Sequence, residues 1–185
     1  DVINLEADTV DSNDTINLGD GTDRIVIDAS IRGVGADADE TFDGMTSIEE
    51  VEAQGAVGVI NITLDDDAQT TGVSKIILTQ NAGAVDANVD LDLGVDFDRA
   101  LTVDMAANST LDLDNDANVN VTIKMVTTDS TSDNTLTIED AGTGTVAINI
   151  TVDDAAQTID NAGTAAKNDV IITNANMAST LANID

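Results

Sequence analysis

The stretch Asp11–Asp28, DSNDTINLGDGTDRIVID, decides how the rest of the chain is interpreted. It places Asp14 and Asp23 nine residues apart, and each is followed two positions later by an apolar residue, Ile16 and Ile25. A nine-residue period of this kind consists of a turn of about six residues and a strand of about three. Glycine in such a turn permits positive φ, so that backbone carbonyl oxygens can face a cation. The stretch therefore predicts stacked turns that bind a hard divalent cation.

The segment Gly19–Asp23 forms the turn of the second nine-residue unit. It resembles the nonapeptide of the RTX family, Gly-Gly-x-Gly-x-Asp-x-apolar-x, whose members bind calcium between the stacked turns of a β-roll. Leu18 stands in place of the first glycine, and the preceding unit, Thr9–Asn17, keeps only its aspartate and its isoleucine. An Asp-Gly pair between apolar residues is also typical of an ordinary β-hairpin, which is the alternative interpretation.

The composition combines a modest core with a very large negative charge. Hydrophobic residues make up 42% of the 185 residues and aromatic residues only 1%, so Val, Ile, Leu and Ala must form narrow stacked layers. Asp and Glu number 36 against 6 Lys and Arg, a formal net charge of −30. Two carboxylates about 4 Å apart repel by roughly 1 kcal/mol in water and roughly 4 kcal/mol at an effective dielectric constant near 20, whereas a domain is stable by only about 5–15 kcal/mol. We expect bound divalent cations to neutralise these carboxylates. The alternative is that the negative charge belongs to a halophilic or solubilising surface.

Several residue types that carry chemistry are absent from the chain. It contains no His and no Cys, which excludes thiol nucleophiles, disulfides, Ser-His-Asp triads and the usual zinc sites. Two Phe and no Trp or Tyr are poor material for sugar subsites, so we do not expect a glycosidase or another enzyme. The acidic charge disfavours nucleic acid as a partner, and no apolar run is long enough to predict a membrane span. The missing Met at position 1 and the missing Cys suggest a part of a longer, secreted bacterial protein.

Apolar and polar residues alternate in short runs from Gly55 onward, which predicts strands with one buried face. We predict an all-β fold, a right-handed parallel β-solenoid or β-roll stacked on calcium-binding turns, with a β-sandwich as the alternative. The segment Phe42–Glu52 fits either a helix or a strand, and it resembles the Gly-x-x-x-Ile-Glu-x-Val element of RTX-related surface-layer proteins and adhesins. Runs of this alternating kind are Ile60-Ile62-Leu64, Val89-Leu91-Leu93, Leu101-Val103-Met105, Leu111-Leu113, Val119-Val121-Ile123, Leu136-Ile138 and Val146-Ile148-Ile150.

One internal duplication is much stronger than the others. The sequence Ile60–Thr70 returns as Ile148–Thr158, a shift of 88 residues, and Lys75–Thr79 returns as Val170–Thr173. Duplication implies an array in which each unit buries its apolar face against the next. We therefore divide the chain into a calcium-binding segment, 1–54, and a repeat region, 55–185, within which 55–83 corresponds to 142–176.

Three groups of residues are candidates for cation binding. The preferred site consists of Asn13, Asp14, Asp20 and Asp23 with the carbonyls of Gly19 and Gly21. The second consists of Asp65, Asp66 and Asp67, with Asp153 and Asp154 as their equivalents in the duplicated unit. The third, Asp112, Asp114, Asn115 and Asp116, is similar to an EF-hand loop without its glycine and closing glutamate. Charge that keeps a strand edge solvated is an alternative reason for these aspartates.

The resemblance implies a role as well as a cofactor. RTX-type surface-layer proteins and large adhesins are extracellular proteins of the bacterial cell surface that require Ca²⁺. We expect a calcium-dependent structural segment of a surface-layer or extracellular-matrix protein, which stiffens and self-assembles when calcium neutralises its Asp-rich turns. The alternative is a calcium-dependent adhesin domain that binds a surface glycan or another ligand.

Overall fold

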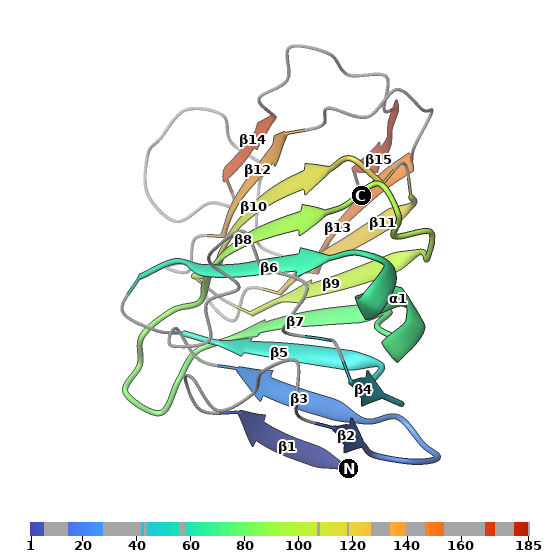
Figure 1. Cartoon of the computed structure of the whole chain (residues 1–185). Helices are drawn as coiled ribbons and strands as arrows, with labels where there is room; N and C mark the ends of the chain where they lie inside the picture. Colours follow the sequence, from blue (N-terminus) through green and yellow to red (C-terminus); the bar gives the residue numbers. More distant parts are fainter. Residues whose placement is uncertain are drawn as a thin grey trace.

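The computed structural model describes residues 1–5, 15–27, 42, 44–55, 58–106, 108–117, 119–126, 134–139, 147–153, 169–172 and 180–184. The chain is a parallel β-solenoid: it winds into coils, and most coils contribute one strand to each of two sheets. Figure 1 shows the strands of successive coils stacked from the N-terminal end toward the C-terminal end. The predicted solenoid is confirmed.

The odd-numbered strands form one eight-stranded sheet, which we call the odd sheet. Five even-numbered strands form the opposite, even sheet, and β2 and β4 pair by themselves. The odd sheet contains β1 (Val2–Leu5), β3 (Arg24–Ile27), β5 (Glu50–Gln54), β7 (Lys75–Thr79), β9 (Leu101–Met105), β11 (Val121–Val126), β13 (Ala147–Asp153) and β15 (Thr180–Ile184). The even sheet contains β6 (Ile60–Leu64), β8 (Asn88–Leu93), β10 (Thr110–Asn115), β12 (Thr135–Glu139) and β14 (Asp169–Ile172), and the small sheet contains β2 (Ile16–Asn17) and β4 (Met45–Thr46).

Every strand pair among the described residues is parallel. Parallel neighbours require a long crossover and cannot be joined by a tight hairpin. The β-sandwich alternative is therefore wrong. The hairpin alternative for Gly19–Asp23 is also wrong, because this turn joins β2 to β3, which belong to different sheets.

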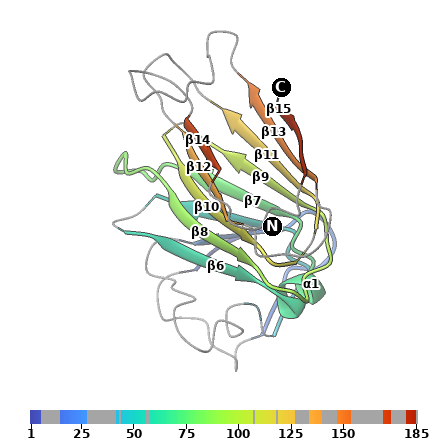
Figure 2. The same cartoon turned by 90° about the horizontal axis from the view of Figure 1, so that it is seen from above.

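The core consists mainly of aliphatic side chains. It lies between the two sheets, which Figure 2 shows from above. In β6 the residues Ile60, Ile62 and Leu64 are buried, while the polar residues between them face outward, as the alternation predicted. Parallel register repeats this arrangement from coil to coil, so that Ile62 pairs with Leu91, which pairs in turn with Leu113. Apolar side chains of successive coils therefore lie in rows along the stack.

The described residues of the segment 42–52 form no helix, so the helix alternative for it is wrong. β4 and β5 lie in this segment, separated by a bend at Ser47, whose φ is 59°. The single helix among the described residues, α1 (Asp66–Thr71), was not predicted. Asp65 caps its N-terminus by accepting the Asp67 N–H at 3.1 Å, and Gly72 ends it with a φ of 117°.

The two copies of the internal duplication lie in opposite sheets. β6, from the first copy, belongs to the even sheet, whereas β13, from the second copy, belongs to the odd sheet. β13 is the seventh strand after β6 in chain order. Because each coil here contributes two strands, a shift of seven strands is three and a half coils. The odd sheet runs through both predicted segments, 1–54 and 55–185, and the boundary between them stays a prediction.

Candidate functional site

The outward face of the even sheet carries stacked aspartates on β8 and β10. Both strands contain an Asp-Leu-Asp sequence, and their register places Asp90 beside Asp112 and Asp92 beside Asp114. Neighbouring strands of a sheet are about 4.8 Å apart, so aligned carboxylates repel each other. None of the five even-sheet strands contains a Lys or an Arg. The negative charge on this face is therefore not balanced within its own strands.

Asp92, Asp114 and Asp116 form what we call the even-face triad. One carboxylate oxygen from each of the three lies within 4.8 Å of the other two, and all three residues are partly buried. Asp92 belongs to one coil, and Asp114 and Asp116 belong to the next. Calcium takes six to eight oxygen ligands, and carboxylates are the strongest of them. The triad could hold a metal ion that links the two coils.

Burial and neighbouring charges change the acidity of this face. Burial raises the pKa of Asp90, and the adjacent Asp112 raises it further. Burial likewise raises the pKa of Asp92, with Asp116 and Asp90 adding to the effect. A raised carboxyl pKa means that the ionised form is disfavoured in the folded protein. A cation at the triad would offset this penalty.

A second triad lies at the start of α1. Asp65, Asp66 and Asp67 offer carboxylate oxygens that also lie within 4.8 Å of one another, so this group could hold a metal ion too. The structure thus brings together three residues that were predicted as one site. Here, however, Asp65 uses an oxygen to cap the helix.

The preferred turn of the sequence analysis has the predicted backbone but a different aspartate arrangement. Gly19 and Gly21 both have positive φ, 88° and 143°, and Asp20 is exposed. Asp23 is only 1% exposed, and its Oδ1 forms an ion pair with the N-terminal ammonium group of Asp1. The remaining predicted ligands of this site, Asn13 and Asp14, lie outside the described residues.

The other predicted residues are distributed as follows. Asp153 is the last residue of β13, whereas its sequence equivalent Asp65 lies just beyond β6, and Asp154 lies outside the described residues. In the third group Asn115 is buried and donates to the Val119 carbonyl oxygen at 3.2 Å, so it belongs to the core.

Sequence reasoning missed Asp92, the residue that completes the even-face triad. The feature that could have identified it is a repeated Asp-Leu-Asp sequence, which occurs at Asp90–Asp92 and again 22 residues later at Asp112–Asp114. That distance is one coil, and only the register of parallel strands makes the two copies neighbours.

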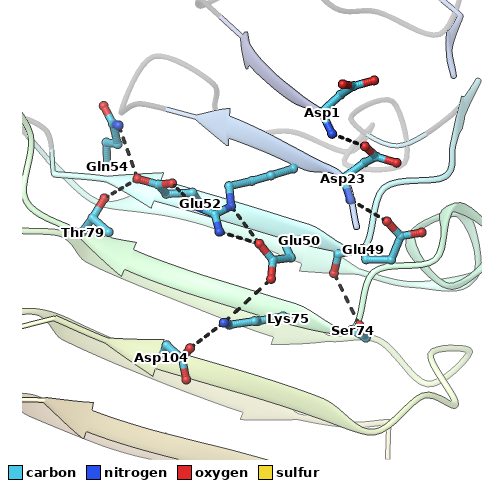
Figure 3. Close-up of polar contacts among 11 residues, drawn as sticks. Asp1, Asp23, Glu49, Glu50, Glu52, Gln54, Ser74, Lys75, Thr79 and Asp104 are labelled. Carbon is cyan, nitrogen blue, oxygen red and sulfur yellow. Dashed lines mark hydrogen bonds and ion pairs between the residues drawn. The ribbon is translucent and has the colours of Figure 1, made fainter. Parts of the chain in front are cut away.

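On the outward face of the odd sheet, acidic side chains form ion pairs with basic side chains of neighbouring coils (Figure 3). Arg24 Nη2 lies 2.6 Å from Glu50 Oε2, and Arg24 Nη1 lies 2.8 Å from Glu52 Oε2. Lys75 Nζ lies 2.7 Å from Asp104 Oδ2 and 3.8 Å from Glu50 Oε1. We call this arrangement, continued by Lys124, the odd-face charge ladder: Arg24, Glu50, Glu52, Lys75, Asp104 and Lys124.

The charge ladder shifts the acidity of its members toward ionisation. Burial alone would raise the pKa of Glu52, but hydrogen bonds from Thr79, Arg24 and Gln54 together lower it. A hydrogen bond to Glu50 raises the pKa of Arg24, although burial opposes this effect. The two faces of the solenoid therefore differ: protein side chains neutralise the odd face, and the even face lacks such partners within its strands.

Comparison with known proteins gives no relative. No protein family, no curated protein and no solved structure matches this chain. Within the described part of the chain, no helix combines the length and the apolar character that crossing a membrane requires.

Proposed function

We propose that this chain is a calcium-stabilised structural segment of a secreted bacterial surface protein, of the surface-layer or extracellular-matrix kind, without catalytic activity. The even-face triad is the observation that carries the proposal, because its three carboxylates come from two successive coils. A cation bound there would join the coils. The acidic composition and the RTX-like turn sequence support calcium as that cation.

The mechanism is charge neutralisation along a stack. Without a cation, Asp90, Asp92, Asp112 and Asp114 repel one another across about 4.8 Å. A divalent ion replaces this repulsion by attraction to both coils, so adjacent coils close and the rod stiffens. Because the ion binds only the folded form, it adds stability as RT ln(1 + [Ca]/Kd), about 2.7 kcal/mol at a hundredfold excess over Kd.

The experiment compares two double variants with the same change in charge. Asp92→Asn with Asp114→Asn removes two ligands of the even-face triad, and Asp96→Asn with Asp98→Asn neutralises two exposed aspartates elsewhere. Calcium stoichiometry by native mass spectrometry and the calcium-induced rise in melting temperature are measured for both. We expect the triad variant to lose one bound calcium and most of that rise, and the control to keep both.

Equal calcium binding by the two variants would contradict the assignment of the triad. Failure of the wild-type chain to bind calcium at all, with an unchanged melting temperature after addition of EGTA, would contradict the proposed function itself.

A further inference from the structure

A recurring contact joins successive coils at the residue just before a strand. Asp23 immediately precedes β3, and Glu49 immediately precedes β5. The Asp23 N–H donates to Glu49 Oε2 at 2.8 Å, while the Glu49 and Glu50 N–H groups donate to the Asp23 carbonyl oxygen at 3.1 and 3.0 Å. The two coils are thus bonded in both directions at this position, through one backbone carbonyl and one side-chain oxygen. Figure 3 shows the bond from Asp23 to the Glu49 side chain.

The same contact occurs one coil earlier. Asp1 immediately precedes β1, and its carbonyl oxygen accepts the Arg24 N–H at 2.9 Å. Asp23 Oδ1 accepts a hydrogen bond from the N-terminal ammonium group of Asp1 and forms an ion pair with it, so the donor in this coil is charged. Asp23 therefore receives a donor from the preceding coil with its side chain and offers its own N–H to the side chain of the following coil.

The even sheet repeats the contact with a neutral side chain. Ser109 immediately precedes β10, and Asn134 immediately precedes β12. The Ser109 N–H donates to Asn134 Oδ1 at 2.9 Å, and the Thr135 N–H donates to the Ser109 carbonyl oxygen at 3.0 Å. Both Ser109 and Asn134 are completely buried. The uncharged amide of Asn134 makes here the bond that the Glu49 carboxylate makes in the odd sheet, so an acceptor oxygen without negative charge is sufficient for this contact.

The physical reason lies in the corner of each coil. At the residue before a strand the chain is still turning, so its N–H points toward the neighbouring coil outside the regular ladder of the sheet. A buried donor without an acceptor is unfavourable. We infer that Asp23, Glu49 and Asn134 are strand-start acceptors: each supplies the missing oxygen to the coil before it and thereby fixes the register of the stack without a cation.

This inference goes beyond the proposed function, because it gives some acidic residues of the chain a role that is independent of calcium. Asp23 is the critical case. Its Oδ2 is buried and has no hydrogen-bond partner among the described residues, so a cation ligand is the competing explanation there. The two explanations predict different effects of Asp23→Asn on the rise in melting temperature that calcium produces.

The test uses the full chain with substitutions at each strand-start acceptor. Glu49→Gln and Asp23→Asn keep an acceptor oxygen without the negative charge, whereas Glu49→Ala, Asp23→Ala and Asn134→Ala remove it; Asn134 has no acceptor-keeping variant because a carboxylate there would be a buried charge. Asp96→Ala, at an exposed aspartate that belongs to none of the candidate cation groups, is the control. Melting temperatures are measured by circular dichroism in EGTA and again in calcium, and amide hydrogen exchange is followed at Asp23 and Ser109.

We expect the alanine variants to melt roughly 3–10 °C lower in EGTA, while the acceptor-keeping variants and the control stay close to wild type. Glu49→Ala should speed exchange of the Asp23 amide, and Asn134→Ala should speed exchange of the Ser109 amide. If an alanine variant does not fold while its acceptor-keeping partner does, the inference is supported. The rise in melting temperature on adding calcium should be the same in Asp23→Asn as in wild type.

Two results would overturn the inference. The first is an alanine variant with wild-type melting and unchanged exchange of the paired amide in EGTA. The second is a loss of the calcium-induced rise in Asp23→Asn, which would make Asp23 a cation ligand. The EGTA measurements need no bound calcium, so they remain decisive even if the proposed calcium function fails.

Discussion

A single glycine, Gly55, controls how closely two segments of the chain approach each other. A Cβ atom at Gly55 would lie 1.8 Å from the Val85 carbonyl oxygen and 2.6 Å from the Asp86 carbonyl carbon. Both obstacles are backbone atoms, which cannot rotate away. We expect Gly55→Ala to lower the free energy of unfolding by about 2–4 kcal/mol, measured by urea denaturation.

Gly94→Ala is the matched control for this substitution. Like Gly55, Gly94 follows a strand and donates its N–H to a neighbouring coil, in this case to Leu64 at 2.8 Å. Its nearest obstacle is the Leu64 carbonyl oxygen at 3.4 Å, which is close to ordinary contact. A loss as large for Gly94→Ala as for Gly55→Ala would show that any added methyl group is harmful and that the close approach at Val85 is not the cause.

At the scale of single residues, sequence reasoning identified positions but not their partners. The nine-residue spacing selected Asp23 as a cation ligand, which stays a prediction, but it did not reveal that Asp23 is buried and forms an ion pair with the N-terminal ammonium group of Asp1. Asp92 was not selected, because its triad partners are separated from it by one coil in the sequence. In a solenoid the neighbours of a residue are set by the coil length, and this length varies along the chain.

Among the elements, β5 carries two acidic members of the odd-face charge ladder, Glu50 and Glu52, and the ionisation of Glu52 makes stability depend on pH. The folded-state pKa of Glu52 is below its ordinary value of 4.5. A carboxyl group of this kind contributes stability that is present above its unfolded pKa and is lost as the pH falls through the folded value. We expect Glu52→Gln to reduce the acid sensitivity of the melting temperature below about pH 4.5, measured in EGTA.

The comparison must be made as a difference between wild type and variant. The raised pKa values of Asp90 and Asp92 have the opposite sign: their contribution is present at low pH and is lost as the pH rises. Because wild type and Glu52→Gln share Asp90 and Asp92, this contribution cancels in the difference between their melting temperatures at each pH. Asp98→Asn, on an exposed residue, is the control, and an equal effect of both substitutions would count against a special role of Glu52.

At the same scale, strands were predictable and the helix was not. Strict alternation of apolar and polar residues located β6, β8, β9 and β10, because it reports directly on one buried and one solvated face. The six residues of α1 are too few for a helical period to be recognised. Its start signal, Asp65, was present in the sequence but was assigned to a cation site, and its stop signal, Gly72, was not used.

For the whole molecule, the net charge of −30 predicts an unusual response to salt. The Debye length falls from about 10 Å at 0.1 M to about 3 Å at 1 M ionic strength, which screens repulsion between the stacked carboxylates. We therefore expect the melting temperature in EGTA to rise between about 0.1 M and about 1 M NaCl. The same salt also screens the attraction between the ion pairs of the odd-face charge ladder, which lowers the melting temperature. This effect involves fewer charges than the repulsion does.

The calcium-saturated protein serves as the control, since bound divalent ions leave less repulsion to screen. A melting temperature that falls with NaCl in EGTA would mean that the paired charges of the odd face outweigh the unbalanced charge of the rest, and would contradict the electrostatic argument.

The architecture as a whole was predictable because the duplication and the aromatic-poor core both point to stacked layers. The distribution of charge over the two sheets was not. The sequence shows an excess of acid everywhere, and only the register separates the odd face, where Arg24 and Lys75 neutralise their neighbours, from the even face, where stacked aspartates remain.

The offset of three and a half coils between the two copies of the duplication bears on any longer chain built from this unit. Successive copies would be related by a screw operation and not by simple translation, since β6 and β13 lie on opposite sides. Equivalent outward-facing residues of successive copies would therefore lie on alternate sides of the stack, so one duplicated sequence would present its side chains on both sides of the molecule.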